Sequence, residues 1–313
     1  MLAPIMRAAL RVGVLLGAAM MLMSGCGEQK TSPAPQRPVQ LKETETYSGD
    51  NAYVHCAAIC ALGPRPTGSD AYVQQVNYIT EQLQRVGWQV QARQFYPQPG
   101  LSMCNVHAVY GEESDPRPLL ISCHIDTKGR GSNAILGADD GASGAAAIIE
   151  LARILARRPE LAEKIELVFY DGEEALSEHI TPEDGLYGSR FDVQRRGDVL
   201  PRWMINLDMV GGAGKTIGVP LWDTSERMYR DYVKAVRAQG LSEVRWTIYP
   251  GSYWDDHRPF LEAGVDTLNL IAQFQRSNWW HTVRDDMSRI SPDSLLETGK
   301  LVLQLIEQLV AYL

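Results

Sequence analysis

A pair of adjacent carboxylates, Glu173 and Glu174, lies in the middle of this 313-residue chain. The pair follows residues 165–170, a β-branched and aromatic run that predicts a buried strand, and a break at Asp171 and Gly172. Neighbouring residues that leave a strand point to opposite sides, so one glutamate can hold a metal ion while the other faces a substrate. A solvated acidic turn is the simpler interpretation of such a pair, and the rest of the sequence has to decide between the two.

Similar polar residues follow the other predicted strands. They are His124 and Asp126 at the end of residues 119–125, Asp139 and Asp140 in the run GADDGASG, Asp208 near the end of residues 203–209, and His281 in the run WWHT. Open α/β sheets place ligand sites outside the carboxyl ends of their strands, so these side chains are expected to converge. Oxygen and imidazole ligands without thiolates suit Zn²⁺, and a catalytic zinc site keeps one position open.

The elements that must position these residues alternate between strands and helices. Predicted strands are 88–95 and 105–110, both as edge strands, and 119–125, 165–170, 203–209, 247–249 and 267–271. Predicted helices are 53–62, a Ser69-capped helix with apolar positions from Val73 to Val86, then 142–156, 226–239 and 292–313. This alternation predicts an α/β fold, a single domain with a central, mostly parallel or mixed twisted sheet and helices on both faces.

The N-terminus has the features of an export signal. Arg7 and Arg11 precede an apolar run at residues 12–22, and the following residues up to Cys26 resemble a bacterial lipoprotein cleavage box. We expect residues 1–25 to be a signal peptide, Cys26 to be lipidated and tethered to a membrane, and 26–49 to be a flexible tether. Residues 50–313 then form the folded domain of an exported lipoprotein of the cell envelope. An ordinary cleaved signal peptide is the alternative.

The net charge argues against one class of function, and the cysteines leave the disulfide pairing open. A formal net charge of -8 without a long basic run argues against nucleic-acid binding, which depends on neutralising phosphates. Four cysteines remain after Cys26, and their pairing cannot be read from the sequence. Cys56 and Cys60 lie on one side of a predicted helix, as a buried apolar pair or a bridge, and Cys104 and Cys123 lie on two strand-like runs that could meet.

The motifs HxD, GADDxASG, EE, LDM and WHT, in this order, resemble the zinc-dependent aminopeptidase family with co-catalytic metals. The resemblance covers residues 63–313. It implies that Asp140 can bridge two metal ions, that Glu174 and His281 complete one site, and that Glu173 is the general acid/base. His124 and Asp208 would complete the second site, so the resemblance implies one zinc ion, with two as the alternative.

Finer features are similar to the glutaminyl-peptide cyclotransferase branch of that family. These are FYDGEEA followed by a ten-residue spacer and LYGSR, the run DDHRPF from Asp255, and Cys123 before His124. There are departures from that branch. Trp254 replaces a glutamine, His179 is the nearest match to an aromatic pocket residue, and Ala145 stands where a disulfide partner of Cys123 is expected.

The branch implies a reaction in which the α-amine of an N-terminal glutamine attacks its own side-chain amide. Glu173 would move the proton, Asp208 and Asp255 would orient it, and the substrate would contact a pocket made of Trp280, Trp254, His257 and Phe260. Peptide or protein N-termini are the expected partners, and the chain is expected to act as a monomer. A zinc metalloaminopeptidase uses the same ligand types and remains an alternative, and a non-catalytic binding lipoprotein is a more remote one.

Overall fold

The computed structural model describes residues 40–112 and 116–313. The predicted signal peptide, Cys26 and most of the predicted tether lie outside the described residues, so their roles stay predictions. Among the described residues, no helix is long and apolar enough to cross a membrane.

A single eight-stranded sheet runs through the domain in the order β1-β2-β4-β3-β5-β8-β6-β7. The strands are β1 (Gln89–Gln98), β2 (Leu101–Val109), β3 (Leu119–His124), β4 (Ile165–Tyr170), β5 (Trp203–Asp208), β6 (Ile217–Pro220), β7 (Trp246–Tyr249) and β8 (Asp266–Ala272). Strands β4, β3, β5 and β8 are parallel, whereas β1, β2 and β6 introduce antiparallel pairs. The predicted mixed sheet is therefore confirmed.

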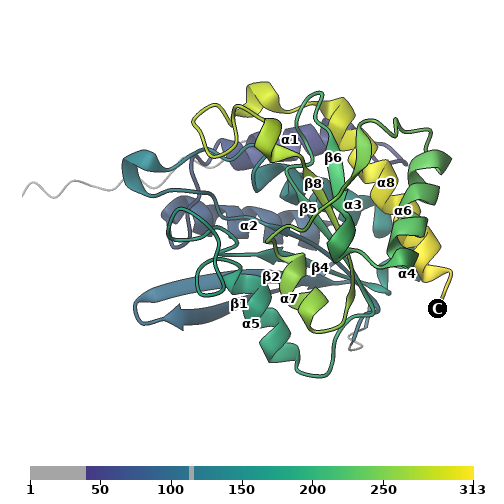
Figure 1. Ribbon diagram of the computed structural model, residues 1–313, viewed down its shortest axis with the longest axis horizontal. Helices are drawn as coiled ribbons and strands as arrows, with labels where there is room; N and C mark the ends of the chain where they lie inside the picture. Colours follow the sequence, from purple (N-terminus) through teal and green to yellow (C-terminus); the bar gives the residue numbers. More distant parts are fainter. Residues whose placement is uncertain (1–39, 113–115) are drawn as a thin grey trace, which may run out of the picture. The chain divides into compact units, whose positions relative to one another are not determined.

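Helices cover both faces of this sheet (Figure 1). The helices are α1 (Gly49–Cys60), α2 (Asp70–Arg85), α3 (Ala142–Leu155), α4 (Pro159–Ala162), α5 (Tyr187–Arg196), α6 (Glu226–Ala238), α7 (His257–Glu262) and α8 (Pro292–Val310). In β3, Leu119 and Ile121 pack into the large core on the α1, α3 and α8 side, and Leu120 packs into a smaller core that includes Phe260 of α7. Alternate side chains of the strand thus fill two layers.

Three predictions about local structure are wrong. Strand β2 is not an edge strand, because it pairs with β1 on one side and β4 on the other. Val73, predicted on the apolar side of its helix, is 54% exposed, although Ser69 caps that helix as expected by accepting a hydrogen bond from the amide of Tyr72. Cys104 and Cys123 do not meet, because β4 separates their strands, and all four cysteines in the described part of the chain are free thiols.

Candidate metal centre

The carboxyl ends of the parallel strands bring the predicted ligands to one edge of the sheet. His124, the last residue of β3, pairs in register with Tyr170, the last residue of β4, and Glu173 and Glu174 follow that strand. Asp208 ends β5. Asp140 lies in the turn before α3, where Gly141 has a φ of +102° that favours glycine, and a Cβ there would approach the carbonyl oxygen of Asp126 to 2.9 Å.

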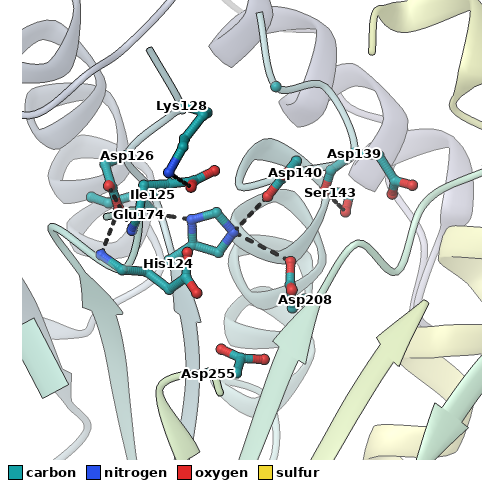
Figure 2. A network of polar contacts seen from close by, with 12 residues as sticks. His124, Ile125, Asp126, Lys128, Asp139, Asp140, Ser143, Glu174, Asp208 and Asp255 are labelled. Atoms are coloured by element: carbon teal, nitrogen blue, oxygen red, sulfur yellow. Dashed lines mark hydrogen bonds and ion pairs between the residues drawn. The ribbon is translucent and has the colours of Figure 1, made fainter. Parts of the chain in front are cut away.

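Two groups of three ligands form at this edge, and Asp140 belongs to both. Figure 2 shows Asp140 with His124 and Asp208 of one group and with Glu174 of the other. In the first, His281 Nε2 lies 3.2 Å from Glu174 Oε1 and 3.6 Å from Asp140 Oδ2. In the second, His124 Nε2 lies 3.2 Å from Asp140 Oδ1 and 3.3 Å from Asp208 Oδ1. The structure thus brings together the five side chains that the sequence assigned to the metal.

The first group fits a metal ion. Asp140 Oδ2 and Glu174 Oε1 are buried and accept no hydrogen bond, although buried carboxylate oxygens normally have a partner. Ligands about 2.0–2.1 Å from a tetrahedral zinc ion are separated by roughly 3.3 Å, close to the spacing of these atoms. A cation bound by Asp140, Glu174 and His281 would satisfy both oxygens.

The pKa values at this site follow from burial and from the neighbouring charges. Burial raises the pKa of Glu173 well above its usual range, and the nearby carboxylates of Glu174 and Asp255 add to this shift. Burial also raises the pKa of Asp208 to about 7. Burial alone would raise the pKa of Asp140, but the bond to His124 and the charges of His124, His281 and Lys215 together outweigh burial and lower that pKa. Glu173 therefore holds a proton more readily than an exposed glutamate does.

Neighbouring side chains hold these groups in place, and two of them, Asn206 and Asn269, were not singled out in the sequence. The amides of Glu173 and Glu174 donate to the two oxygens of Asp126, at 3.1 and 3.2 Å. The side-chain amides of Asn206 and Asn269 donate to the two oxygens of Asp255, at 2.9 and 2.8 Å. The sequence carries little signal for these asparagines, because the bonds that give them a role cross between strands.

Asp285 and Lys128 also contact the predicted ligands, and neither was singled out in the sequence. The carboxylate of Asp285 accepts the amides of Asp139 and Asp140, at 2.8 and 3.0 Å, and burial raises its pKa to about 7. Lys128 Nζ lies 3.3 Å from Glu174 Oε2 and donates to the carbonyl oxygen of Ala175. Lys128 lies two residues after Asp126 of the HxD motif. This closeness in sequence was the only sign that Lys128 could belong to the site.

A cavity of about 200 Å³ opens next to the ligands. The predicted pocket residues Trp280 and Trp254 line it, together with Tyr253 and Phe274, and Trp254 remains 44% exposed at its mouth. The prediction for His257 and Phe260 needs correction, since neither side chain lines the cavity. His257 is buried against Asp223, and Phe260 belongs to the small core on the other face of the sheet.

The ten-residue spacer, Leu176 to Gly185, forms the opposite wall of the cavity through Glu178, His179 and Ile180. Asp184 accepts the amides of Leu176 and Ser177, both at 2.8 Å, and so closes the spacer into a loop. His179, the nearest match to the aromatic pocket residue of the cyclotransferase branch, thus lies beside the site.

The model of peptidase family M28 matches residues 105–306. The chain belongs to this family. It is 28% identical over 272 residues to the glutaminyl-peptide cyclotransferase-like protein of Bos taurus. The aligned region covers 76% of this chain and 70% of the relative. Proteins with solved structures are also similar, along nearly their whole length. Glutaminyl cyclase from Porphyromonas gingivalis has a TM-score of 0.76 and 25% identity, covering 84% of this chain and 99% of that one. A leucine aminopeptidase precursor from Bacteroides thetaiotaomicron has a TM-score of 0.74 and 26% identity, covering 83% and 97%.

Proposed function

We propose that the protein is a zinc-dependent glutaminyl-peptide cyclotransferase, which converts an N-terminal glutamine into pyroglutamate and releases ammonia. The observation that carries this proposal is the ordered spacer. It walls a cavity that has Glu173 and Asp208 among its lining residues and aromatic side chains along its sides. Such a cavity can enclose one side chain of a peptide N-terminus beside a proton carrier. The similar proteins that are named as cyclotransferases or cyclases support the same conclusion.

The reaction joins the α-amine nitrogen of the glutamine to its side-chain carbonyl carbon, and the bond from that carbon to the amide nitrogen breaks. A zinc ion held by Asp140, Glu174 and His281 would supply Lewis-acid polarisation of the carbonyl. Glu173 takes a proton from the attacking amine and returns it to the departing ammonia. We propose one zinc ion per chain.

Two more residues, Asp255 and Trp280, assist this proton transfer and the binding of the substrate. Asp255 is 1% exposed and does not line the cavity, so it acts through its charge, which raises the pKa of both Glu173 and Asp208. Figure 2 shows it beneath Asp208. Trp280 packs against Phe274 in a tilted arrangement, with ring centroids 4.5 Å apart, and offers an apolar surface to the glutamine side chain. Holding the amine next to the amide supplies much of the rate advantage of an intramolecular reaction.

A metalloaminopeptidase is the second candidate, and the group formed by His124, Asp140 and Asp208 favours it, because it offers ligands for a second metal ion. The purified domain should be given peptides that begin with Gln, Leu or Ala and followed by mass spectrometry. Loss of ammonia without shortening of the Gln peptide is the expected result, and release of free amino acids would overturn it. Two tightly held zinc ions per chain would favour the peptidase, and zinc binding without turnover would favour a non-catalytic lipoprotein.

We also propose that the protein is exported and anchored in the cell envelope through a lipid on Cys26, and that it acts there on peptide N-termini as a monomer. The support is the signal-like composition of residues 1–25 and the Pro- and polar-rich composition of residues 26–49. Expression of Cys26→Ser in a bacterium fed radioactive palmitate tests the anchor. The variant should lose the label and leave the membrane fraction, and retention of the label would place the lipid elsewhere.

A further inference from the structure

Lys215 is a buried cation behind the metal ligands. It lies in the loop after β5 and is 7% exposed, and its Nζ forms an ion pair with Asp139 Oδ2. The other carboxylate oxygen of Asp139 accepts the amide of Gly211 at 2.9 Å. Asp139 directly precedes the shared ligand Asp140, so Lys215 is one residue removed from the metal site.

The same ammonium group also contacts the loop that carries the histidine ligand. Lys215 Nζ lies 4.8 Å from the centre of the Trp279 ring, and the guanidinium carbon of Arg289 lies 5.2 Å from it. Cations at this distance are attracted by the negative face of an indole ring. Trp279 is two residues before His281, so its ring restrains the backbone from which that ligand projects.

We infer that Lys215 is a positioning residue that holds the turn of Asp140 and the loop of His281 in the geometry that the metal requires. This inference rests on the proposed zinc site. The two ligands come from segments 141 residues apart in the sequence, and Lys215 is bound to a residue next to or near each of them. A single buried group therefore ties the two segments together before an ion arrives.

Removing the ammonium group has two consequences. The carboxylate of Asp139 is left buried without its counter-charge, and breaking a buried pair from one side is destabilising. The Trp279 ring also loses one of its two cations, so the backbone near His281 gains freedom. Outer partners of this kind typically change metal affinity by about 10–100-fold when they are removed. We expect a loss of zinc affinity in that range for Lys215→Met.

A second variant displaces the lysine without changing any charge. A Cβ built on Gly212 would overlap the carbon chain of Lys215 and would lie 2.7 Å from Asp139 Oδ2. Gly212→Ala should therefore weaken zinc binding in the same direction. Lys215→Arg keeps a cation and should retain most of the affinity. Lys300→Met, the same substitution at an exposed position of α8, is the matched control and should change nothing.

The experiment measures the zinc dissociation constant by competition with a coloured chelator, together with the visible spectrum of the cobalt-substituted protein, which reports ligand geometry. Lys215→Met and Gly212→Ala should raise the dissociation constant about 10–100-fold and shift the cobalt bands. Wild-type affinity and spectrum in a folded Lys215→Met chain would overturn the inference, even if its melting temperature falls. If that variant does not fold, Gly212→Ala decides by the same criteria. A wild-type chain without zinc affinity overturns both the inference and the proposed function. One that binds zinc but does not cyclise glutamine overturns the function alone.

Discussion

Replacing Asp126 with asparagine tests how the two glutamates are held. Asp126 is 1% exposed, and its two oxygens accept the amides of Glu173 and Glu174 at 3.1 and 3.2 Å. Asparagine has almost the same shape but offers one oxygen and one NH₂ group. One of the two amides must then face a donor, and no other acceptor is recorded for either amide among the described residues.

The size of the effect follows from this geometry. A buried donor left without a partner costs about 1–3 kcal/mol. For a domain of this length, a loss of about 2 kcal/mol corresponds to a fall of roughly 4–8 °C in the melting temperature. The catalytic effect should be larger than the stability effect suggests, because a displacement of about 1 Å at a reacting group can reduce the rate roughly 100-fold. We therefore expect Asp126→Asn to lower kcat/KM by about 10–100-fold.

The assay combines urea denaturation with steady-state release of ammonia from a Gln peptide. Asp184→Asn is the matched comparison, because Asp184 accepts two successive amides in the same way, at 2.8 Å each, but the residues that donate them are exposed. Water can replace that lost bond, so its unfolding free energy should fall by less than about 1 kcal/mol. If Asp126→Asn unfolds and turns over like the wild type, the carboxylate does not hold the glutamates.

Three further predictions follow from the same contacts. Glu173→Gln should lower kcat by about 10²–10⁴-fold while zinc stays bound, as a proton carrier requires, and loss of the zinc would assign this residue to the metal instead. His281→Ala should abolish tight zinc binding in a chelator competition, whereas His124→Ala should retain one zinc ion. If His124→Ala abolishes tight binding and His281→Ala retains it, the tightly bound ion occupies the other group of ligands. Glu166 has a pKa lowered to about 2 from 4.5, because its bonds to His107 and Arg196 outweigh burial. Glu166 therefore contributes about 3 kcal/mol to the free energy of unfolding above pH 4.5, and this contribution is lost as the pH falls toward 2. In Glu166→Gln, the free energy of unfolding should decline less steeply with falling pH. An unchanged slope would contradict this.

The parts of the fold that the sequence predicted share one physical cause. Every residue of β3, β4 and β5 is buried, so these strands appear in the sequence as mostly apolar runs. Because those strands are parallel, polar residues that follow them must meet at one edge. His124, Glu174 and Asp208 could therefore be assigned to one site before their distances were known.

The parts that were missed depend on contacts between distant segments. Helix α5 begins at Tyr187. Its N-cap residue, Leu186, has a φ of 54° and makes no side-chain capping bond, so no local signal marks the start of the helix. Phe260 was assigned to the pocket because it belongs to the run DDHRPF, which resembles the cyclotransferase branch. However, α7 directs it into the small core on the other face of the sheet. Asn206 and Asn269 gain their role only because β5 and β8 pair in register at these residues.

The cyclase and the peptidase differ in their demands on one side chain, Asp208. Its Oδ1 lies 3.3 Å from His124 Nε2, and both belong to the second group of metal ligands. A second ion would take up that carboxylate, whereas the cyclase needs it to orient a proton beside Glu173 and Asp255. Metal binding and proton orientation exclude one another here, because a carboxylate whose oxygens bind a metal ion no longer orients a proton equally well.

Zinc beyond one equivalent should therefore inhibit cyclisation. The rate of ammonia release should rise as the first equivalent is added to the metal-free protein and fall as a second one binds. The variant His124→Ala should keep the rise and lose the fall, because the second group is then incomplete. A rate that continues to rise to two equivalents would mean that both ions take part in the reaction, and the peptidase would then be the better description of this site.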